Sequence, residues 1–136
     1  MHRDRAMAVA LAGLVAAIVL AVLYQRGPDG VAWFPACSFH RLTGLHCPGC
    51  GMTRAVHATL HGRIGEAFRF NPLGMILVPV LLIWLGLRIP GWIRGAPPEP
   101  GAKPAAILGW WALGLVLVFW VARNIPVWPF VSLAPP

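Results

Sequence analysis

The chain has 136 residues, of which 58% are hydrophobic and only 11% charged, and its formal net charge is +7. A soluble domain usually carries about 25% charged residues. A chain of this length cannot bury so much apolar surface in a core of its own, so the composition excludes an ordinary soluble domain and predicts a single membrane domain over residues 1–136. The basic residues are spread singly along short loops, a pattern typical of topology signals beside lipid headgroups. We therefore expect a lipid bilayer as a partner and no nucleic acid.

Three apolar stretches predict three transmembrane helices. The first, at about 6–24, contains no charged residue, and a span needs roughly 20 residues of this kind. A cleaved signal peptide is the alternative, but the sequence offers a poor cleavage site and favours an uncleaved anchor. The second predicted span, at about 70–89, begins with Asn71 as N-cap and Pro72 as first helical residue. The third lies at about 105–122.

The cysteine-motif region, residues 37–71, lies between the first two spans. After Cys50 the apolar residues recur at helical spacing, which predicts a short amphipathic helix. Cys47 is its expected N-cap region, Pro48 its first helical residue and Gly62 its stop. At about 12 to 14 residues this helix is too short to span, so we expect an interfacial or re-entrant helix. The predicted fold class is an all-α membrane protein with three transmembrane helices and this additional helix.

Three spans place the two termini on opposite sides of a membrane. If the N-terminus is cytoplasmic, the basic residues on the cytoplasmic side are Arg3, Arg5, Arg88, Arg94 and Lys103. Those on the opposite side are Arg26, Arg41, Arg54, Arg63, Arg69 and Arg123. The two sets are nearly equal, but the basic head and the charged 88–103 loop favour a cytoplasmic N-terminus. The cysteine region then lies on the extracytoplasmic side, where disulfides persist.

Four interpretations of the three cysteines remain open. Cys37-x2-His40 and Cys47-x2-Cys50 form two ligand pairs of a kind suited to zinc. Cys50, near a helix N-terminus and Arg54, is expected to have a lowered thiol pKa and to support thiol–disulfide exchange, with Cys47 or Cys37 as the resolving thiol. A structural disulfide would fix the loop and leave one free thiol. In the fourth interpretation the cysteines are small residues that pack in a core.

The other polar residues of the motif also admit two interpretations. Arg54, with Thr53, could hold a phosphate, a carboxylate or a lipid headgroup at the helix N-terminus, but the sequence favours an arginine that satisfies backbone carbonyls or reaches the surface. Asn71 is expected to cap a helix. For His57 and His61 a solvated helix face is favoured over metal ligation. No carboxylate pair, phosphate-binding loop or Ser-His-Asp set accompanies them, so the sequence leans against an enzyme.

The motif and its surroundings resemble a known family. The residues that carry the resemblance are Cys37, Leu42-Thr43-Gly44, Cys47-Pro48-Gly49-Cys50-Gly51-Met52-Thr53-Arg54-Ala55, Gly62, Ala67, Asn71-Pro72-Leu73 and Arg123-Asn124 with Pro126. This family is Domain of Unknown Function 2752, a group of small bacterial membrane proteins, and the resemblance extends over roughly residues 35 to 126. It implies a multi-pass protein of the bacterial inner membrane. The site positions that it marks are Cys37, Cys47, Cys50, Thr53, Arg54, Asn71 and Arg123.

Two classes of function follow from these observations. The first, which the sequence favours, is an accessory or binding module whose cysteine-rich loop is structural and which docks a membrane protein, a lipid or a second copy of itself. The tryptophans of the last predicted span favour it, because aromatic residues anchor interfaces. The second is a thiol-redox or zinc-binding membrane protein that uses Cys37, Cys47 and Cys50 chemically. In both classes we expect Asn71 and Arg123 to pack against the polar centre formed by the motif.

Overall fold

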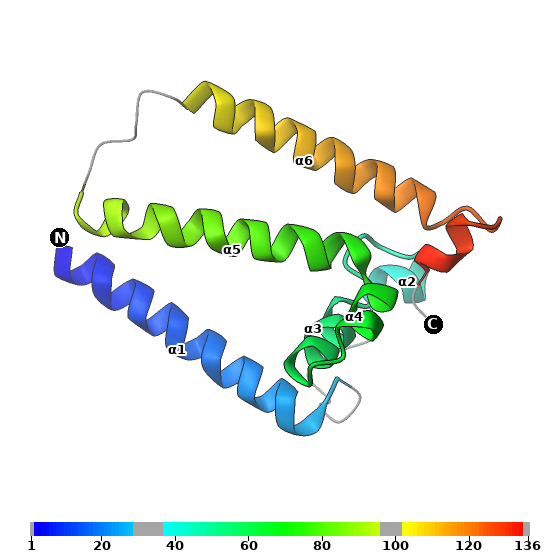
Figure 1. Cartoon of the computed structure of the whole chain (residues 1–136), viewed down its shortest axis with the longest axis horizontal. Helices are drawn as coiled ribbons and strands as arrows, with labels where there is room; N and C mark the ends of the chain where they lie inside the picture. Colours follow the sequence, from blue (N-terminus) through cyan, green and yellow to red (C-terminus); the bar gives the residue numbers. More distant parts are fainter. Residues whose placement is uncertain (1, 29–36, 96–101, 135–136) are drawn as a thin grey trace.

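A computed structural model describes residues 2–28, 37–95 and 102–134, and for residues 102–108 it describes the backbone alone. Within these ranges the chain is all α-helical and contains no strand, as the sequence predicts. Three long helices run between the two ends of the molecule (Figure 1): α1 (His2–Arg26), α5 (Pro72–Ile93) and α6 (Ala102–Ala122). Together these three helices contain half of the residues of the chain.

Three short helices gather at one end of the molecule, where α1 ends, α5 begins and α6 ends (Figure 1). They are α2 (Ser38–Thr43), α3 (Met52–Leu60) and α4 (Ile64–Phe70), and the 3-10 helix η1 (Phe130–Leu133) lies at the same end. We call residues 37–71, together with Arg123 and Asn124, the head. The long helices therefore connect the head with the opposite end, where the N-terminus lies.

Two of the predicted spans correspond to helices long and apolar enough to cross a membrane. By length and composition these are α1 and α5, whose most apolar windows have mean hydropathies of 2.8 and 2.1. Only 6% and 11% of these windows are buried inside the molecule, far less than in the core helix of a soluble protein. Helix α6 coincides with the third predicted span, but its side chains are described only over Gly109–Ala122, which is apolar and shorter. The third span therefore stays a prediction.

Polar side chains join the N-terminus of α1 to the C-terminal end of α5. The His2 ring bonds through Nδ1 to the Ile93 carbonyl oxygen at 2.8 Å, and the Arg5 guanidinium donates to the Trp92 carbonyl at 2.9 Å. The guanidinium carbon of Arg5 also lies 5.3 Å from the centre of the Trp92 ring. These carbonyls belong to the last turn of α5, where the regular helical donors run out. The Trp92 carbonyl also accepts from the Gly95 amide at 3.2 Å, so the basic end of α1 adds to the hydrogen bonds at this helix end.

The other end of α1 is held by two histidines of α3. The Leu23 oxygen can only accept a hydrogen bond, so His57 donates from Nδ1 to it at 2.8 Å. The His61 ring stacks on Tyr24, with 4.3 Å between the ring centres. The prediction of a solvated face is therefore wrong for His57, which is half-buried in this contact between segments 34 residues apart in the chain, whereas His61 is exposed.

Small residues form the core between α3 and α4. Ala55 and Ala58 of α3 and Ala67 of α4 are each at most 1% exposed, and Phe70 and Met75 pack against them. Alanine at the contact allows two helix backbones to approach closely, because no long side chain separates them. The head is thus compact although its buried apolar residues are few.

The turn between α3 and α4 follows the sequence prediction. Helix α3 ends at Leu60, and Gly62 comes two residues later with a φ of +74°, a conformation that favours glycine. Arg63 then pairs with Glu66 at 3.1 Å, as their spacing allows. Both side chains are about half exposed, so water screens the pair and it stabilises the head only slightly.

The start of α3 differs from the prediction. The helix does not begin at Pro48 but at Met52, and Gly51 is its N-cap with a φ of +81°. Residues 48–51 form turns instead, with a hydrogen bond from the Cys50 amide to the Cys47 carbonyl at 3.1 Å. The left-handed conformation at Gly51 breaks the helical path at this point. The loop that holds Cys47 and Cys50 is therefore free to turn its carbonyl groups toward other parts of the chain.

Candidate functional site

The three cysteine side chains converge in the head. Cys37 is the N-cap residue of α2, and Cys47 and Cys50 lie in the turns before α3. The Sγ atom of Cys47 lies 3.4 Å from that of Cys37 and 3.3 Å from that of Cys50, and all three sulfur atoms lie within 4.8 Å of one another. All three are free thiols. They are close enough to hold one metal ion.

Two of the thiols have shifted pKa values, in opposite directions. The backbone N–H of His40 and the Cys47 side chain lower the pKa of Cys37. Burial raises the pKa of Cys50 to about 12, and hydrogen bonds with the side chains of Cys47 and Cys37 add to this shift. The expected lowering at Cys50 is therefore wrong, because the thiol lies before the N-cap Gly51 and is shielded from water. Cys37, which is partly exposed, is the more reactive thiol.

Arg123 holds the loop between the two motif cysteines. One guanidinium nitrogen donates to the carbonyls of Cys47 and Pro48, at 3.0 and 3.2 Å, and the other donates to the carbonyl of Cys50 at 3.3 Å. A planar guanidinium presents several donors in a fixed fork, so one side chain can bind several carbonyls of a tight loop. Arg123 follows directly after α6 and thereby connects the end of that helix to the motif.

Asn71 binds the same loop from the other side. Its Nδ2 group donates to the carbonyls of Pro48 and Cys50, at 2.9 and 3.2 Å. Its Oδ1 atom accepts from the Gly74 amide at 2.8 Å, so it also caps the N-terminus of α5, as the sequence predicts. Asn71 is fully buried, with an exposed fraction of 0%. One side chain thus fixes both the cysteine loop and the start of α5.

Asn124 makes two hydrogen bonds with the backbone of His46, the residue before Cys47. Its Oδ1 atom accepts from the His46 amide and its Nδ2 group donates to the His46 carbonyl, both at 2.8 Å. The same Nδ2 group also donates to the Trp120 carbonyl in the last turn of α6. This two-way pairing holds the loop as a neighbouring strand would. With Arg123 it makes the end of α6 part of the head.

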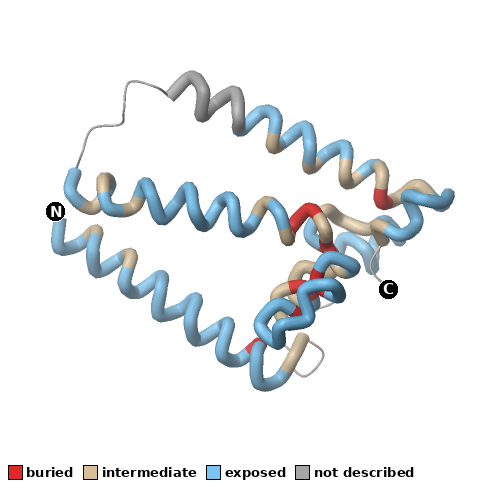
Figure 2. The backbone as a smooth tube through the Cα atoms, in the orientation of Figure 1, coloured by how far each residue is buried: buried red, intermediate tan, exposed pale blue. Residues whose placement is uncertain are grey.

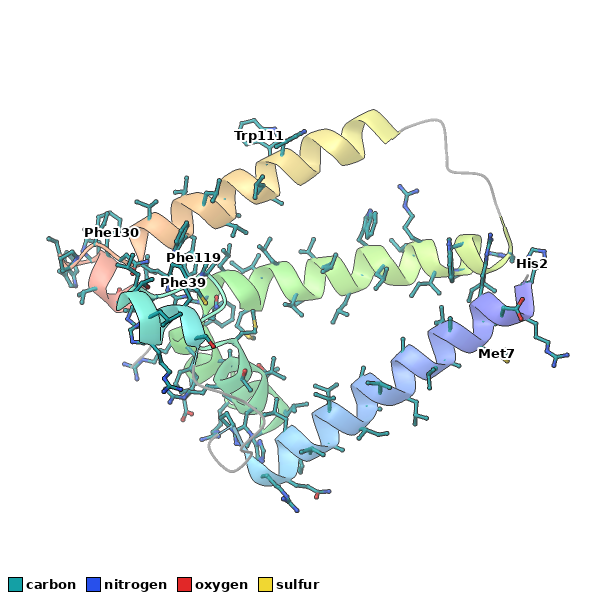
Figure 3. The ribbon with its side chains drawn as sticks, turned by 180° about the vertical axis from the view of Figure 1, so that it is seen from behind. His2, Met7, Phe39, Trp111, Phe119 and Phe130 are labelled. Atoms are coloured by element: carbon teal, nitrogen blue, oxygen red, sulfur yellow. The ribbon has the colours of Figure 1, made fainter. Side chains whose placement is uncertain are left out.

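Arg123 carries a positive charge in a buried position. It is 1% exposed, and its Nε atom has no hydrogen-bond partner among the described residues. Burial lowers the pKa of this guanidinium, while the nearby Cys50 and Cys47 oppose that effect. Its guanidinium carbon lies 5.0 Å from the centre of the Phe119 ring, and Figure 3 shows Phe119 and Phe39 together where α6 meets the head. A buried cation among neutral carbonyls favours an anion beside it.

Two of the predicted site side chains stand outside this group. The His40 ring is stacked on His46, with 4.4 Å between ring centres, and His40 is not in the group of close metal-ligating atoms. Thr53 and Arg54 follow Gly51 in the first turn of α3. Arg54 is exposed and lines a pocket that contains none of the cysteines. The structure thus gathers Cys37, Cys47, Cys50, Asn71 and Arg123, and the side chains of His40 and Arg54 do not belong to this group.

Sequence reasoning overlooked two contributors to the head. Asn124 was visible only as a neighbour of Arg123, although an asparagine directly after an apolar stretch signals a buried or capping amide. His57 was assigned to solvent because its contact with α1 joins distant parts of the chain. No local pattern reports a pairing of that kind.

The fold and the site define a class: over the described residues the protein is all-helical, with two helices long and apolar enough to cross a membrane and a polar cysteine-containing head at one end of them. The model of a family described as "Protein of unknown function (DUF2752)" matches residues 37–85. It is the family that the motif resembles, so the resemblance is confirmed over this stretch, which covers residues 37–71 of the head and α5 as far as Leu85. No curated protein and no solved structure matches the chain.

Proposed function

We propose that this protein is a small membrane protein whose head binds a zinc ion through Cys37, Cys47 and Cys50, and that the ion fixes the head as a docking module. The observation that carries the proposal is the convergence of three sulfur atoms within 4.8 Å from two separate segments. Thiolate is a preferred ligand of zinc, and a Cys-x2-Cys pair lets both sulfurs reach one ion. An odd number of thiols cannot all pair as disulfides, whereas one ion uses all three.

The charges around the cysteines support this proposal. Three thiolates on one Zn²⁺ leave one net negative charge, and the guanidinium of Arg123 supplies one positive charge at the carbonyls of Cys47 and Cys50. The high pKa of buried Cys50 disfavours a lone thiolate there, and a bound cation removes that penalty. Asn71 and Arg123 hold the loop by its backbone, in the way that surrounding groups commonly orient metal ligands. Water or a group from a partner would complete the fourth position.

The direct test is the metal content of the full chain, purified in detergent from zinc-supplemented cells. We expect about one zinc per chain, lost on chelation together with a fall in the melting temperature, because structural zinc contributes folding free energy. Cys37→Ser and Cys50→Ser should each abolish stoichiometric metal. His40→Ala is the matched control and should retain it, since His40 stands outside the cysteine group. A His40→Ala variant that loses the metal would restore the four-ligand arrangement expected from the sequence.

Counting thiols on the same sample separates the other interpretations. Metal-free protein with three thiols that react without reductant would contradict the zinc site and leave packing as the role of the cysteines. Two thiols that appear only after reduction would show a disulfide. Blocked thiols that become reactive on chelation are the result expected for a metal centre.

A second candidate function is thiol–disulfide exchange, favoured by the lowered pKa of Cys37 and its 3.4 Å separation from Cys47. The Cys37 thiolate would attack a disulfide of a partner protein, and Cys47 would then displace the partner's sulfur. The products are a Cys37–Cys47 disulfide and two partner thiols, so two electrons and two protons pass to the partner. In that case Cys47→Ser should trap a mixed disulfide at Cys37, and Cys50→Ser should leave the exchange intact.

We also propose the orientation that the basic residues favour, with a cytoplasmic N-terminus, an extracytoplasmic head and a bacterial inner membrane around the long helices. The alternation of the three long helices between the two ends of the molecule supports a three-span arrangement (Figure 1). A membrane-impermeant thiol reagent applied to intact spheroplasts, after chelation, should label Cys37. Labelling only after the membrane is opened would reverse the orientation.

A further inference from the structure

We infer that a pocket at the C-terminal end of α1 binds a phosphate-bearing anion. In the membrane, this anion is the headgroup of an anionic phospholipid. The pocket has a volume of about 410 Å³ and contains none of the cysteines. Its lining residues are Arg26, Gly27, Pro28, Arg54, His57, Arg63, Glu66 and Phe70. This inference does not depend on the proposed metal centre.

The charge of the pocket points to an anion. Among the described residues that line it there are three guanidinium groups, those of Arg26, Arg54 and Arg63, and one carboxylate, that of Glu66. Glu66 pairs with Arg63 at 3.1 Å, so the positive charges of the lining exceed the negative ones by two. The three arginines come from three elements, the last turn of α1, the first turn of α3 and the N-cap of α4. Like charges gathered from separate elements repel one another unless an anion lies between them. Guanidinium groups bind phosphate oxygens in a bidentate way, which suits this ligand.

Contacts between α1 and α3 hold two walls of the pocket together. His57 lines the pocket and bonds to the Leu23 carbonyl at 2.8 Å, which holds α3 against the end of α1. A Cβ on Gly27 would lie 3.5 Å from the His57 ring, so this glycine, whose φ is +67°, packs directly on it. Phe70 supplies an apolar wall beside the charged one. A volume of this size lies in the usual range of small-molecule sites, about 300–1,000 Å³.

The position of the pocket favours a lipid headgroup as the source of the phosphate. Arg26 is the last residue of α1, a helix long and apolar enough to cross a membrane. The end of such a helix lies at the level of the headgroups, where anionic lipids meet basic side chains. A headgroup at this level would place its phosphate between the arginines and its glycerol beside Phe70. A free phosphate ion shares the charge but needs no apolar wall.

The test compares two probes on the full chain. By native mass spectrometry, the protein in mixed detergent micelles is offered phosphatidylglycerol or phosphatidylcholine, and inorganic phosphate is titrated separately by calorimetry. We expect preferential retention of phosphatidylglycerol and weak binding of phosphate. Tight phosphate binding without a preference between the lipids would keep the anion site and assign it to a soluble phosphate compound. No binding of either probe would overturn the inference.

Matched variants distinguish the pocket from a generally basic surface. Arg54→Gln should weaken retention of phosphatidylglycerol about tenfold, because a charge-assisted contact is lost. Arg69 is an exposed residue of α4 that does not line the pocket. Arg69→Gln also removes one positive charge and should leave retention of phosphatidylglycerol unchanged. Glu66→Gln removes the one carboxylate among the described lining residues and should tighten binding about threefold, a gain that misfolding cannot imitate. If Arg54→Gln and Arg69→Gln weaken lipid retention equally and Glu66→Gln does not strengthen it, the lipid binds to a generally basic surface and not to this pocket.

Discussion

The head and the long helices distribute their polar and apolar side chains in opposite ways. In the head, the largest fully buried side chains are those of Arg123 and Asn71, and most of the remaining core is alanine. Along the long helices the large apolar side chains point outward, as in Leu14, Ile83 and Trp111, which are 58%, 66% and 74% exposed. Figure 2 shows the buried segments gathered at the head end, with long exposed stretches elsewhere.

This difference teaches that the two regions are stabilised by different interactions. The buried apolar area of the head is small, so hydrogen bonds to the cysteine loop carry much of its specificity. A buried carbonyl left without a donor costs about 1–3 kcal/mol, and Arg123 and Asn71 together serve three of them. The long helices satisfy their own backbone and expose apolar side chains, an arrangement that is stable in an apolar surrounding. Substitutions should therefore lower the free energy of unfolding strongly in the head and only slightly along the long helices.

The largest effect is expected for Arg123→Ala. The substitution removes the three charge-assisted hydrogen bonds to the carbonyls of Cys47, Pro48 and Cys50, so we expect a loss of about 2–5 kcal/mol in the free energy of unfolding of the head. Thermal unfolding of the protein in detergent, followed by circular dichroism, measures the change. Arg41→Ala, an exposed arginine of α2, is the matched control and should unfold like the unmodified chain. If Arg123→Ala unfolds like Arg41→Ala, the hydrogen bonds of Arg123 do not hold the head.

A smaller effect is expected for Asn71→Asp. Aspartate keeps the oxygen that caps α5 at Gly74 but loses both Nδ2 hydrogen bonds to the loop, so the cap and the loop contacts are separated. We expect a destabilisation of about 2–3 kcal/mol, because two buried hydrogen bonds are lost and the carbonyls of Pro48 and Cys50, which keep only the donors of Arg123, face a carboxylate. Asn71→Ala loses the cap as well and should be lower by about 1 kcal/mol more. Equal stability of Asn71→Asp and the unmodified chain would mean that only the cap matters.

The smallest effect is expected for Ile83→Ala in α5. This side chain is 66% exposed within the molecule, so its removal leaves no internal cavity. We expect a change of less than about 0.5 kcal/mol in thermal unfolding in detergent, against the 2–5 kcal/mol typical of a core isoleucine. A loss of stability as large as that typical of a core isoleucine would place Ile83 in an interface with a second copy or a partner. Measuring the oligomeric state of the same variant by light scattering distinguishes these two cases.

The elements of the fold were largely readable from the sequence, and the errors share one cause. The apolar stretches, the cap at Asn71 and the stop near Gly62 are local signals, and the structure has helices α1 and α5 and the turn after α3 at these places. The start of α3, the pKa of Cys50 and the contacts of His57 were misjudged. Each of these depends on groups far away in the chain that bind or bury the residue in question.

By itself, the sequence determined that the chain is helical, that it carries helices apolar enough for a membrane, and that its polar chemistry is concentrated near Cys47 and Cys50. Length, hydrophobicity and capping residues act within a few turns of the chain, so a linear reading captures them. The sequence also predicts Cys37 beside the other two thiols and Arg123 against the motif. Only the tertiary structure decided which backbone carbonyls Arg123 binds and that Asn124 pairs with His46, from 73 to 78 residues away. Such contacts form because buried carbonyls need donors, and which distant side chain supplies them is settled only when the chain has folded.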